Sequence, residues 1–365
     1  MTRTSDGPRE GPHGGLFGEL KDAVSVRAAV LVIGVLALQL AFITSYLGAF
    51  HKPKPNEIPL AVTSPSAQHI DEALYQLSTL PGSPFDPRAV MDEASARKQL
   101  MNRDVDGVLM VDPRGTADRL LVASASGASL TQALTEAVAV TQKAQRRTVN
   151  VVDMVPGAPG DARGLSGFYL VVGWCVGGYL CAASLAISAG ARPANASRAL
   201  IRLGVLLLYS IAAGLLGAVI AGPVLDALPG SLPALWGLGT LVVFAVGAIT
   251  LAFQGLAGVV GIGLAILLVV VLGNPSAGGA YPYPLLPTFW QVIGPALPPG
   301  AGTFAARSIV YFKGNGANGP MLVLAAWAVA GAAVTLACGK LRAGGTTDSE
   351  PGRTAMASRS TAAAG

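Results

Sequence analysis

The chain has 365 residues, of which 52% are hydrophobic and 12% are charged, and its formal net charge is +5. Soluble domains carry about 25% charged residues, so the composition excludes a soluble globular protein and predicts a polytopic membrane protein. The positive charge is small and dispersed, which argues against nucleic acid as a partner.

Residues 1–27 are expected to form a cytoplasmic tail with an interfacial helix. Residues 1–14 are polar and rich in Gly and Pro, which is typical of a disordered tail. Residues 15–25 predict a short helix lying on the inner membrane surface, because its apolar residues share one helical face. These apolar residues are Leu16, Phe17, Leu20 and Val24. A solvated turn is the alternative, since the segment is short.

Residues 28–50 are uncharged and predict the first transmembrane helix. A span needs about 20 apolar residues. The apolar run exceeds the roughly 7–15 residues of a signal-peptide core, and no cleavage pattern clearly follows it. We therefore expect a retained span.

Residues 51–166 contain 12 Lys or Arg and 13 Asp or Glu, as a soluble domain would. Their pattern predicts the order strand, helix, helix, strand, strand, helix, strand, and so a small α/β domain. The expected strands are 58–63, 107–111, 120–125 and 148–152, and the expected helices are 66–77, 92–103 and 129–144. Ser66 is expected to cap the first helix, and Ser129 with Gln132 to form a capping box.

Five further spans are expected in a membrane domain of residues 167–340, and residues 341–365 are expected to form a disordered cytoplasmic tail. The expected spans are 167–189, 203–225, 234–253, 256–272 and 320–339. With the first helix they give six transmembrane helices in a 1+5 arrangement.

Loop charges predict the orientation. Lys and Arg occur in the N-terminal tail, in the 190–202 loop and in the C-terminal tail, whereas loop 226–233 has none. The positive-inside rule then places both termini in the cytoplasm of a multi-pass plasma-membrane protein. The α/β domain is extracytoplasmic in this topology, and residues 273–320 lie on the same outer side.

Residues 273–320 predict an outer re-entrant segment. No charged residue or His occurs from Ala227 to Ala306, so burial near lipid is allowed. Repeated prolines interrupt the segment, and only Thr288–Gly294 could form an uninterrupted helix, which is far too short to span. Phe289 and Trp290 are expected to hold it at the headgroup level. A Pro-rich loop between two spans is the alternative.

Several kinds of chemistry are absent from the sequence. It contains no P-loop motif, so no ATP site of its own is expected. The three histidines are scattered, and the three cysteines lie in apolar runs, so neither a metal site nor a disulfide framework is predicted. We expect no catalytic or cofactor-binding residues and no enzyme activity. No ionisable residue lies deep in a span, which argues against a proton-driven carrier.

Four passages carry a resemblance to a known family. They are IPLAVTSPS at 58–66, ARKQLMNRDVDGVLMVDP at 96–113, VVDMVPGAPGDARGLSGFYLVVGWCVGGYL at 151–180, and residues 274–314. On these passages the chain resembles the permease subunits of type-2 ABC exporters, in particular the phage-infection-protein-like (YhgE/Pip) branch. The resemblance covers most of residues 28–340.

The resemblance implies a half-transporter that pairs with a second permease copy, as a homodimer or heterodimer, and with a separate P-loop ATPase subunit. The 190–202 loop would contact the ATPase through Arg192, Arg198 and Arg202, although positive-inside topology alone also explains these arginines. The outer segment would form an exit gate, with Gly294 and Gly300 as hinges. The residues assigned to this gate are Asn274, Pro275, Pro287, Phe289, Trp290, Gly294, Pro295, Pro298 and Gly300.

Two functions remain open at this point. The first is an ABC-type export permease that moves an unidentified lipid-like or apolar substrate outward through the bilayer. The second is a non-transporting envelope protein, such as a receptor, an anchor or an accessory subunit, that acts through its extracytoplasmic domain.

Overall fold

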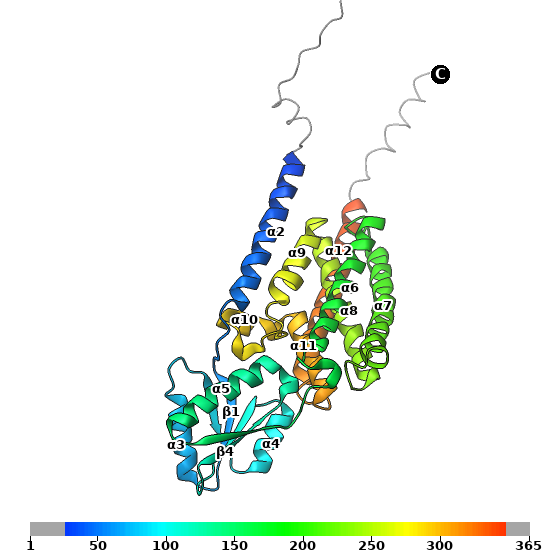
Figure 1. Cartoon of the computed structure of the whole chain (residues 1–365). Coiled ribbons are helices and arrows are strands. Elements are labelled where there is room, and N and C mark those ends of the chain that lie inside the picture. The colour runs from blue at the N-terminus through cyan, green and yellow to red at the C-terminus, as the bar shows by residue number, and fades with distance from the viewer. Residues whose placement is uncertain (1–25, 348–365) are drawn as a thin grey trace, which may run out of the picture. The chain divides into compact units, whose positions relative to one another are not determined.

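The computed structural model describes residues 26–347 and is mostly helical (Figure 1). The chain divides after Thr44 into two units. Helix α2 (Val26–Phe50) begins in the first unit and ends in the second. Five helices are long and apolar enough to cross a membrane, which confirms the prediction of a membrane protein. They are Ala28–Phe50, Ser166–Ala189, Ala196–Val224, Leu232–Ala257 and Asn318–Arg342.

Helix α8 is the centre of a helical bundle in the second unit. It packs against the other three long helices of this unit, and 67% of its most apolar window is buried. Small residues allow this close packing: a Cβ on Gly239 would lie 2.5 Å from the ring of Trp174, and one on Gly178 would lie 2.6 Å from the carbonyl oxygen of Val243. The helices are α6 (Ser166–Ala189), α7 (Ala196–Val219, continued by η3, Ile220–Val224), α8 (Leu232–Ala257) and α12 (Asn318–Thr347).

Helices α8 and α12 run in the same direction, and α7 runs opposite to them. Gly339, near the end of α12, lies against Asn195 at the start of α7, and Gly255, near the end of α8, lies against Cys338. Gly230, just before α8, instead lies against Val310 at the other end of the bundle. The bundle therefore has two distinct ends, and the α/β module (residues 51–165) packs against the second, which we call the junction end.

The expected span at 256–272 is a shorter helix, which begins only after a break that follows α8. It consists of α9 (Val260–Ile266) and the π-helix η4 (Leu267–Gly273), of seven residues each. At about 1.5 Å per residue they reach about 21 Å, less than the hydrocarbon thickness of about 30 Å. The reason is a tight turn: α8 runs on to Ala257, Gly258 has a φ of +64°, and Gly261 packs on the backbone of Phe253.

The module is built on a five-stranded sheet of order β2-β1-β3-β4-β5, parallel except for the β3–β4 pair. The strands are β1 (Ile58–Thr63), β2 (Phe85–Ala89), β3 (Gly107–Met110), β4 (Ala117–Val122) and β5 (Thr148–Asp153). The sequence did not predict β2, because Pro87 and its polar neighbours argue against a strand. As an edge strand β2 tolerates this proline, whereas a central strand would not.

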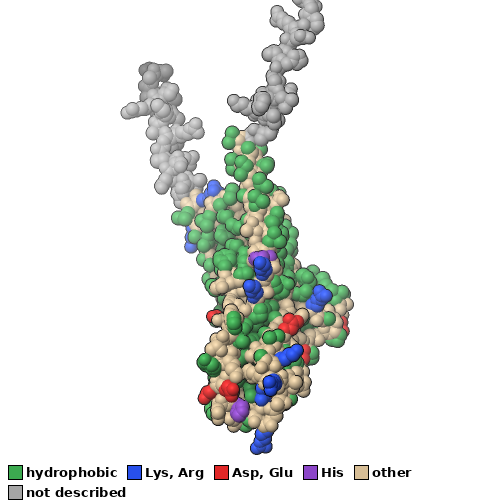
Figure 2. Space-filling model, turned by 60° about the vertical axis from the view of Figure 1, so that its left-hand side comes forward, with side chains coloured by type: hydrophobic (Ala, Val, Ile, Leu, Met, Phe, Trp, Pro, Cys, Tyr) green, Lys and Arg blue, Asp and Glu red, His purple; other side chains and the backbone are tan. Residues whose placement is uncertain are grey.

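Three helices cover the sheet, and alternate residues of β1 point to opposite faces. Ile58, Leu60 and Val62 pack with the α3 and α5 side chains, and Ala61 packs with α4. The helices are α3 (Ala67–Ser78), α4 (Glu93–Asn102) and α5 (Ala128–Ala144). Figure 2 shows hydrophobic side chains covering much of the helical part of the face in view, whereas charged side chains are more frequent on the module below.

The expected helix caps are partly wrong. Ser66 is the N-cap residue of α3, but its side chain makes no capping hydrogen bond. Helix α5 begins at Ala128 after Gly127, so Ser129 and Gln132 form no capping box. The Ser129 hydroxyl donates instead to the carbonyl oxygen of Ala280 at 2.8 Å. This serine therefore joins the module to the segment that follows η4.

Residues 274–317, which we call the docking segment, join η4 to α12. They form η5 (Tyr283–Leu285), α10 (Thr288–Ile293), η6 (Gly294–Ala296) and α11 (Pro298–Tyr311). Helix α11 was not predicted. Its two prolines occupy its first two positions, where a missing backbone donor costs nothing. It packs against α6, α8 and α12, and most of its residues are buried.

The docking segment also completes the two cores of the module. Leu285 belongs to the cluster under α3 and α5, and Phe312 belongs to the cluster under α4. Helix α12 continues to Thr347, so the expectation that residues 341–347 belong to a disordered tail is wrong. The predicted interfacial helix at 15–25 and residues 348–365 lie outside the described residues.

Candidate functional site

The residues assigned to an exit gate lie close together but in different environments. Asn274 and Pro275 directly follow η4, Pro287 precedes α10, Pro295 lies in η6 and Pro298 begins α11. The two aromatic rings expected at the membrane surface differ in exposure, and their depth in the membrane stays a prediction. Trp290 is 9% exposed and packs with Ala49 and Leu286, whereas Phe289 is 58% exposed.

Gly294 and Gly300 lie where two backbones meet. A Cβ on Gly300 would lie 2.0 Å from the carbonyl oxygen of Gly294, and a Cβ on Gly294 would lie 2.1 Å from that of Ser276. Only glycine fits such approaches. Close packing therefore explains both glycines, and their role as hinges stays a prediction.

The arginines assigned to an ATPase-coupling loop do not share one loop. Helix α7 begins at Ala196, so Arg198 and Arg202 are helical and only Arg192 lies in the turn. Arg202 is 5% exposed and donates to the carbonyl oxygens of Ala189 and Gly190 at the end of α6. It caps that helix and is not available to a partner. Arg192 and Arg198 are exposed.

Arg103 is the main polar link between the module and the docking segment. It follows α4 with a φ of +65°, a conformation uncommon for a residue with a side chain. Its Nη1 donates to the carbonyl oxygen of Phe304 at 2.9 Å and to Ser308 Oγ at 2.8 Å. Its guanidinium carbon lies 3.6 Å from the centroid of the Phe304 ring and 5.0 Å from that of Phe312. These are cation–π distances.

Arg307, on α11, joins three segments of the chain. It is 4% exposed. Its Nη1 donates to the carbonyl oxygen of Gly278 at 2.7 Å, and its Nη2 donates to those of Gly279 at 2.8 Å and Gly164 at 3.0 Å. One turn further, the Tyr311 hydroxyl donates to Asp161 Oδ2 at 2.8 Å. The start of α6, the turn after η4 and α11 are thereby held together.

A cavity of about 320 Å³ lies between the module and the docking segment, and we call it the junction cavity. Its polar lining includes Glu57, Arg103, Asp106, Tyr283 and Arg307. In the described part of the chain, neither guanidinium lies within 4.0 Å of a carboxylate oxygen. The Tyr283 hydroxyl and Arg307 Nε are buried without a hydrogen-bond partner among the described residues.

Burial determines the ionisation of these groups. It lowers the pKa of Arg103 to about 9, with the nearby Arg307 charge acting in the same direction, and leaves the guanidinium charged at neutral pH. Burial also raises the pKa of the Asp106 carboxyl to about 6, although the charge of Arg103 opposes this shift. The pKa of the Tyr283 phenol is raised by burial as well, so its hydroxyl remains a donor.

A second hollow of about 510 Å³, the distal crevice, lies at the carboxyl ends of β1 and β3. Helices α3 and α4 cover opposite faces of the sheet, so the topological switch point lies between β1 and β3. In open α/β sheets, ligands bind at the carboxyl ends of the strands at this point. Half of its polar lining residues are acidic, and the polar lining consists of Thr63, Ser64, Asp92, Glu93, Asp112 and Arg119.

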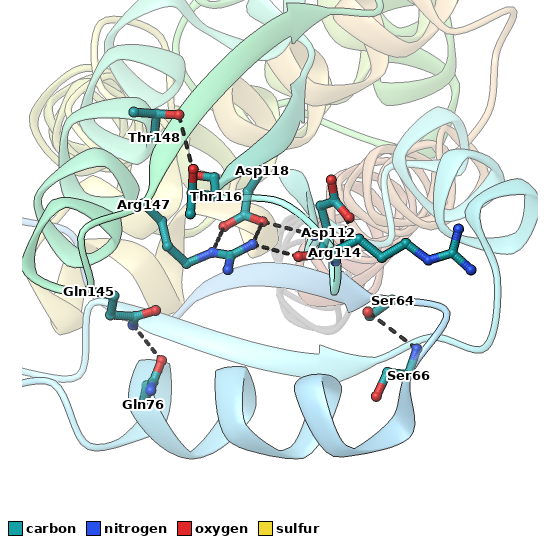
Figure 3. A network of polar contacts seen from close by, with 10 residues as sticks. All are labelled: Ser64, Ser66, Gln76, Asp112, Arg114, Thr116, Asp118, Gln145, Arg147 and Thr148. Atoms are coloured by element: carbon teal, nitrogen blue, oxygen red, sulfur yellow. Dashed lines mark hydrogen bonds and ion pairs between the residues drawn. The ribbon is translucent and has the colours of Figure 1, made fainter.

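A buried ion pair fixes one wall of the distal crevice (Figure 3). Asp118 is fully buried, and its Oδ2 accepts from Arg147 Nε at 2.7 Å. Arg147 Nη2 also donates to the carbonyl oxygen of Asp112 at 2.7 Å, and the Asp112 backbone N–H donates to Asp118 Oδ1 at 2.9 Å. The turn between β3 and β4 is thereby tied to the start of β5.

Sequence reasoning missed the residues that line the junction cavity. Arg103, Tyr283 and Arg307 come from segments that only the fold brings together. One signal was present, because Arg307 is the first charged residue after the uncharged stretch that ends at Ala306. No group of His, Cys, Asp and Glu among the described residues is suited to hold a metal ion. No family model, no curated protein and no solved structure matches the chain.

Proposed function

We propose that this chain is the membrane-spanning permease subunit of an ABC-type exporter, which moves an unidentified lipid-like or apolar substrate outward. The supporting observation is the broken passage between α8 and α12, in which the short helix of α9 and η4 is followed by the non-spanning helices α10 and α11. Broken helices at membrane depth are tolerated where they are buried in protein or line a cavity, and transporters use them to build substrate paths. A simple anchor has no need of such a passage.

The resemblance to type-2 ABC exporter permeases supports the same proposal. Three of the passages that carry it line the junction cavity. Residues 58–66 supply Pro59, residues 96–113 supply Arg103, and residues 274–314 supply Arg307. We regard this junction, where the module rests on the docking segment, as the place that responds to the transport cycle.

The proposed topology has six membrane passages and both termini in the cytoplasm. The fifth passage is the short helix of α9 and η4, which packs against α8 and is followed by the docking segment. The α/β module and the docking segment are then extracytoplasmic. Arg192 donates to the carbonyl oxygen of Leu256 at the end of α8, so the α6–α7 and α8–α9 turns lie together at the end of the bundle opposite to the junction. This is the end at which a separate cytoplasmic ATPase would bind, through Arg192 and Arg198.

One observation favours a second candidate function. The distal crevice lies at the switch point of the sheet, as in many ligand-binding α/β domains. A receptor or accessory subunit of the cell envelope could act through that crevice with no transport at all. The two candidates differ in whether an ATPase is bound.

Purification from native membranes tests the proposal. The full chain, carrying an affinity tag, is isolated in a mild detergent, and its partners and ATP hydrolysis are measured. The exporter proposal predicts co-purification of a P-loop ATPase and of a second permease copy, with hydrolysis that vanishes when the P-loop Lys of the ATPase is replaced. Arg198→Ala should weaken the ATPase association, whereas Arg88→Ala, on the exposed edge of the module, should leave it unchanged. A chain that purifies without an ATPase favours the receptor.

A further inference from the structure

We propose that the junction cavity is a binding site for an oxyanion, a phosphate or carboxylate, carried as the head group of an amphiphile. This proposal assigns a ligand class to the junction cavity. It does not depend on the exporter proposal, because a receptor could have the same site.

The two positive charges of the cavity are only partly compensated, because Asp106 acts on Arg103 and Asp161 acts on Arg307 from beyond ion-pair distance. Arg103 and Arg307 both line it, and no carboxylate of the described residues lies within 4.0 Å of either guanidinium. The hydrogen bonds of Arg307 go to backbone carbonyls, and those of Arg103 go to a carbonyl and a hydroxyl, all of which are neutral. A buried charge without a partner of opposite sign is strongly unfavourable. An anion between the two guanidiniums removes this penalty.

Unused donors line the same cavity. The Tyr283 hydroxyl and the Nε of Arg307 are both buried and have no acceptor among the described residues. Nε and Nη2 of Arg103 also make no hydrogen bond in the described part of the chain. Buried polar groups in folded proteins are nearly always hydrogen-bonded, so the two buried donors, the Tyr283 hydroxyl and Arg307 Nε, indicate a missing acceptor. Phosphate and carboxylate oxygens are acceptors only, and they suit guanidinium donors best.

The two acidic groups of the lining do not fill this role. Glu57 is exposed. Asp106 lies more than 4.0 Å from the Arg103 guanidinium, and burial shifts its pKa to about 6, toward the neutral form. Binding of an anion adds negative charge close to Asp106 and favours its protonation further. The site can therefore carry two positive charges when it is occupied.

Apart from Ser126 and Gln291, the rest of the lining carries no polar side chain, which favours an amphiphile over a free ion. It includes Pro59, Leu130, Pro284, Pro295 and Phe304. Tyr283 also packs with the cluster of Ala49, Leu286 and Trp290, which joins the cavity to the end of α2. The volume of about 320 Å³ lies at the lower end of the range for ligand pockets, roughly 300–1,000 Å³, and suits a head group with a short apolar stem.

The test uses the purified full chain in an uncharged detergent, without any ATPase. The probes are dihexanoyl phosphatidic acid, dihexanoyl phosphatidylcholine and inorganic phosphate, and their dissociation constants are measured by titration calorimetry. We expect the phosphatidic acid to bind at least about tenfold more tightly than the phosphatidylcholine, because a neutral head group does not compensate two guanidiniums. Equally tight binding of inorganic phosphate would support the oxyanion site but assign it to a free ion.

Tyr283→Phe is the decisive variant. The hydroxyl has no hydrogen-bond partner among residues 26–347, so its removal should leave the melting temperature unchanged and weaken phosphatidic acid binding about tenfold. Tyr281→Phe is the matched control, because Tyr281 is absent from the cavity lining and should change neither. The proposal is wrong if the phosphatidylcholine binds as tightly as the phosphatidic acid. It is also wrong if the Tyr283→Phe variant binds the phosphatidic acid as tightly as the wild type does. Since no ATPase is present, neither result bears on the exporter proposal.

Discussion

The guanidinium carbon of Arg103 lies 3.6 Å from the centroid of the Phe304 ring, and its Nη1 donates to the carbonyl oxygen of the same phenylalanine. The two residues are 201 positions apart in the chain. One belongs to the module and the other to helix α11, which is buried among the long helices of the bundle. If the docking segment moves, it must therefore either break this contact or move the module with it.

Replacing Arg103 should loosen the junction. Arg103→Ala removes a cation–π contact and two hydrogen bonds, so we expect a loss of about 2–3 kcal/mol in unfolding free energy. Thermal denaturation of the purified chain measures this loss. Arg88→Ala is the control, since its ion pair with Asp86 is exposed and should contribute less than about 0.5 kcal/mol. Equal melting temperatures for the two variants would contradict the assigned role.

Phe312 should behave as a residue of the module, although it follows α11. It is fully buried in the cluster under α4, with Leu100. Phe312→Ala should cost about 3–5 kcal/mol and leave a cavity in the module, whereas Phe289→Ala, at an exposed position, should cost less than about 1 kcal/mol. Hydrogen exchange locates the effect. Protection should fall in α4 and β3 for Phe312→Ala, and unchanged exchange there would mean that the module does not need the docking segment.

The two arginines at the start of α7 should separate structural from partner-binding roles. Arg202→Ala leaves the carbonyl oxygens at the end of α6 without their donor and should cost about 1–3 kcal/mol. Arg198→Ala should leave stability unchanged, because the side chain is exposed. Thermal denaturation in detergent checks both. A stable Arg202→Ala variant would show that the cap is dispensable. Arg202 would then again be a candidate for contact with the ATPase.

The raised pKa of Asp106 predicts a pH dependence of stability. Because the folded state holds this proton up to about pH 6, whereas an unfolded Asp loses it near pH 3.9, the stabilisation is complete below about pH 4. It is then lost as the pH rises through about 6, by an amount on the order of 2 kcal/mol. Asp106→Asn should abolish this fall. The readout is the melting temperature of both proteins between pH 4.5 and 7, and parallel curves would contradict the shift.

Local patterns predicted much of the fold. The strand at 58–63 and the helix ending at Ala189 follow from residue periodicity and apolar length, and the structure has both. The sequence did not predict β2, because Pro87 obscures an edge strand, and it did not predict α11, because two prolines resemble a break when their position at a helix start is unknown. The predicted span 256–272 begins too early, because the composition of the sequence does not show that α8 continues to Ala257.

The candidate site could not be predicted, and the reason is geometric. Arg103, Tyr283 and Arg307 carry no local motif and are brought together only when the docking segment packs under the module. For the arginines predicted to contact the ATPase, the sequence shows the residues but not their environment. Their positive charge was visible in the sequence, but whether a side chain is exposed, as in Arg198, or caps a neighbouring helix, as in Arg202, depends on the packing of α6 and α7.

The central claim is that the docking segment returns without crossing the membrane, so that both of its ends lie on the side of the module. Single cysteines test it most directly, in a chain whose Cys175, Cys181 and Cys338 are replaced by Ala. Met91→Cys marks the module, Lys313→Cys marks the end of the docking segment and Arg198→Cys marks the opposite end of the bundle, and all three positions are exposed. A membrane-impermeant thiol reagent on intact cells should label the first two, and the third only after permeabilisation. Labelling of Met91→Cys from outside with Lys313→Cys reacting only from inside would mean that the segment crosses the membrane, which contradicts the account.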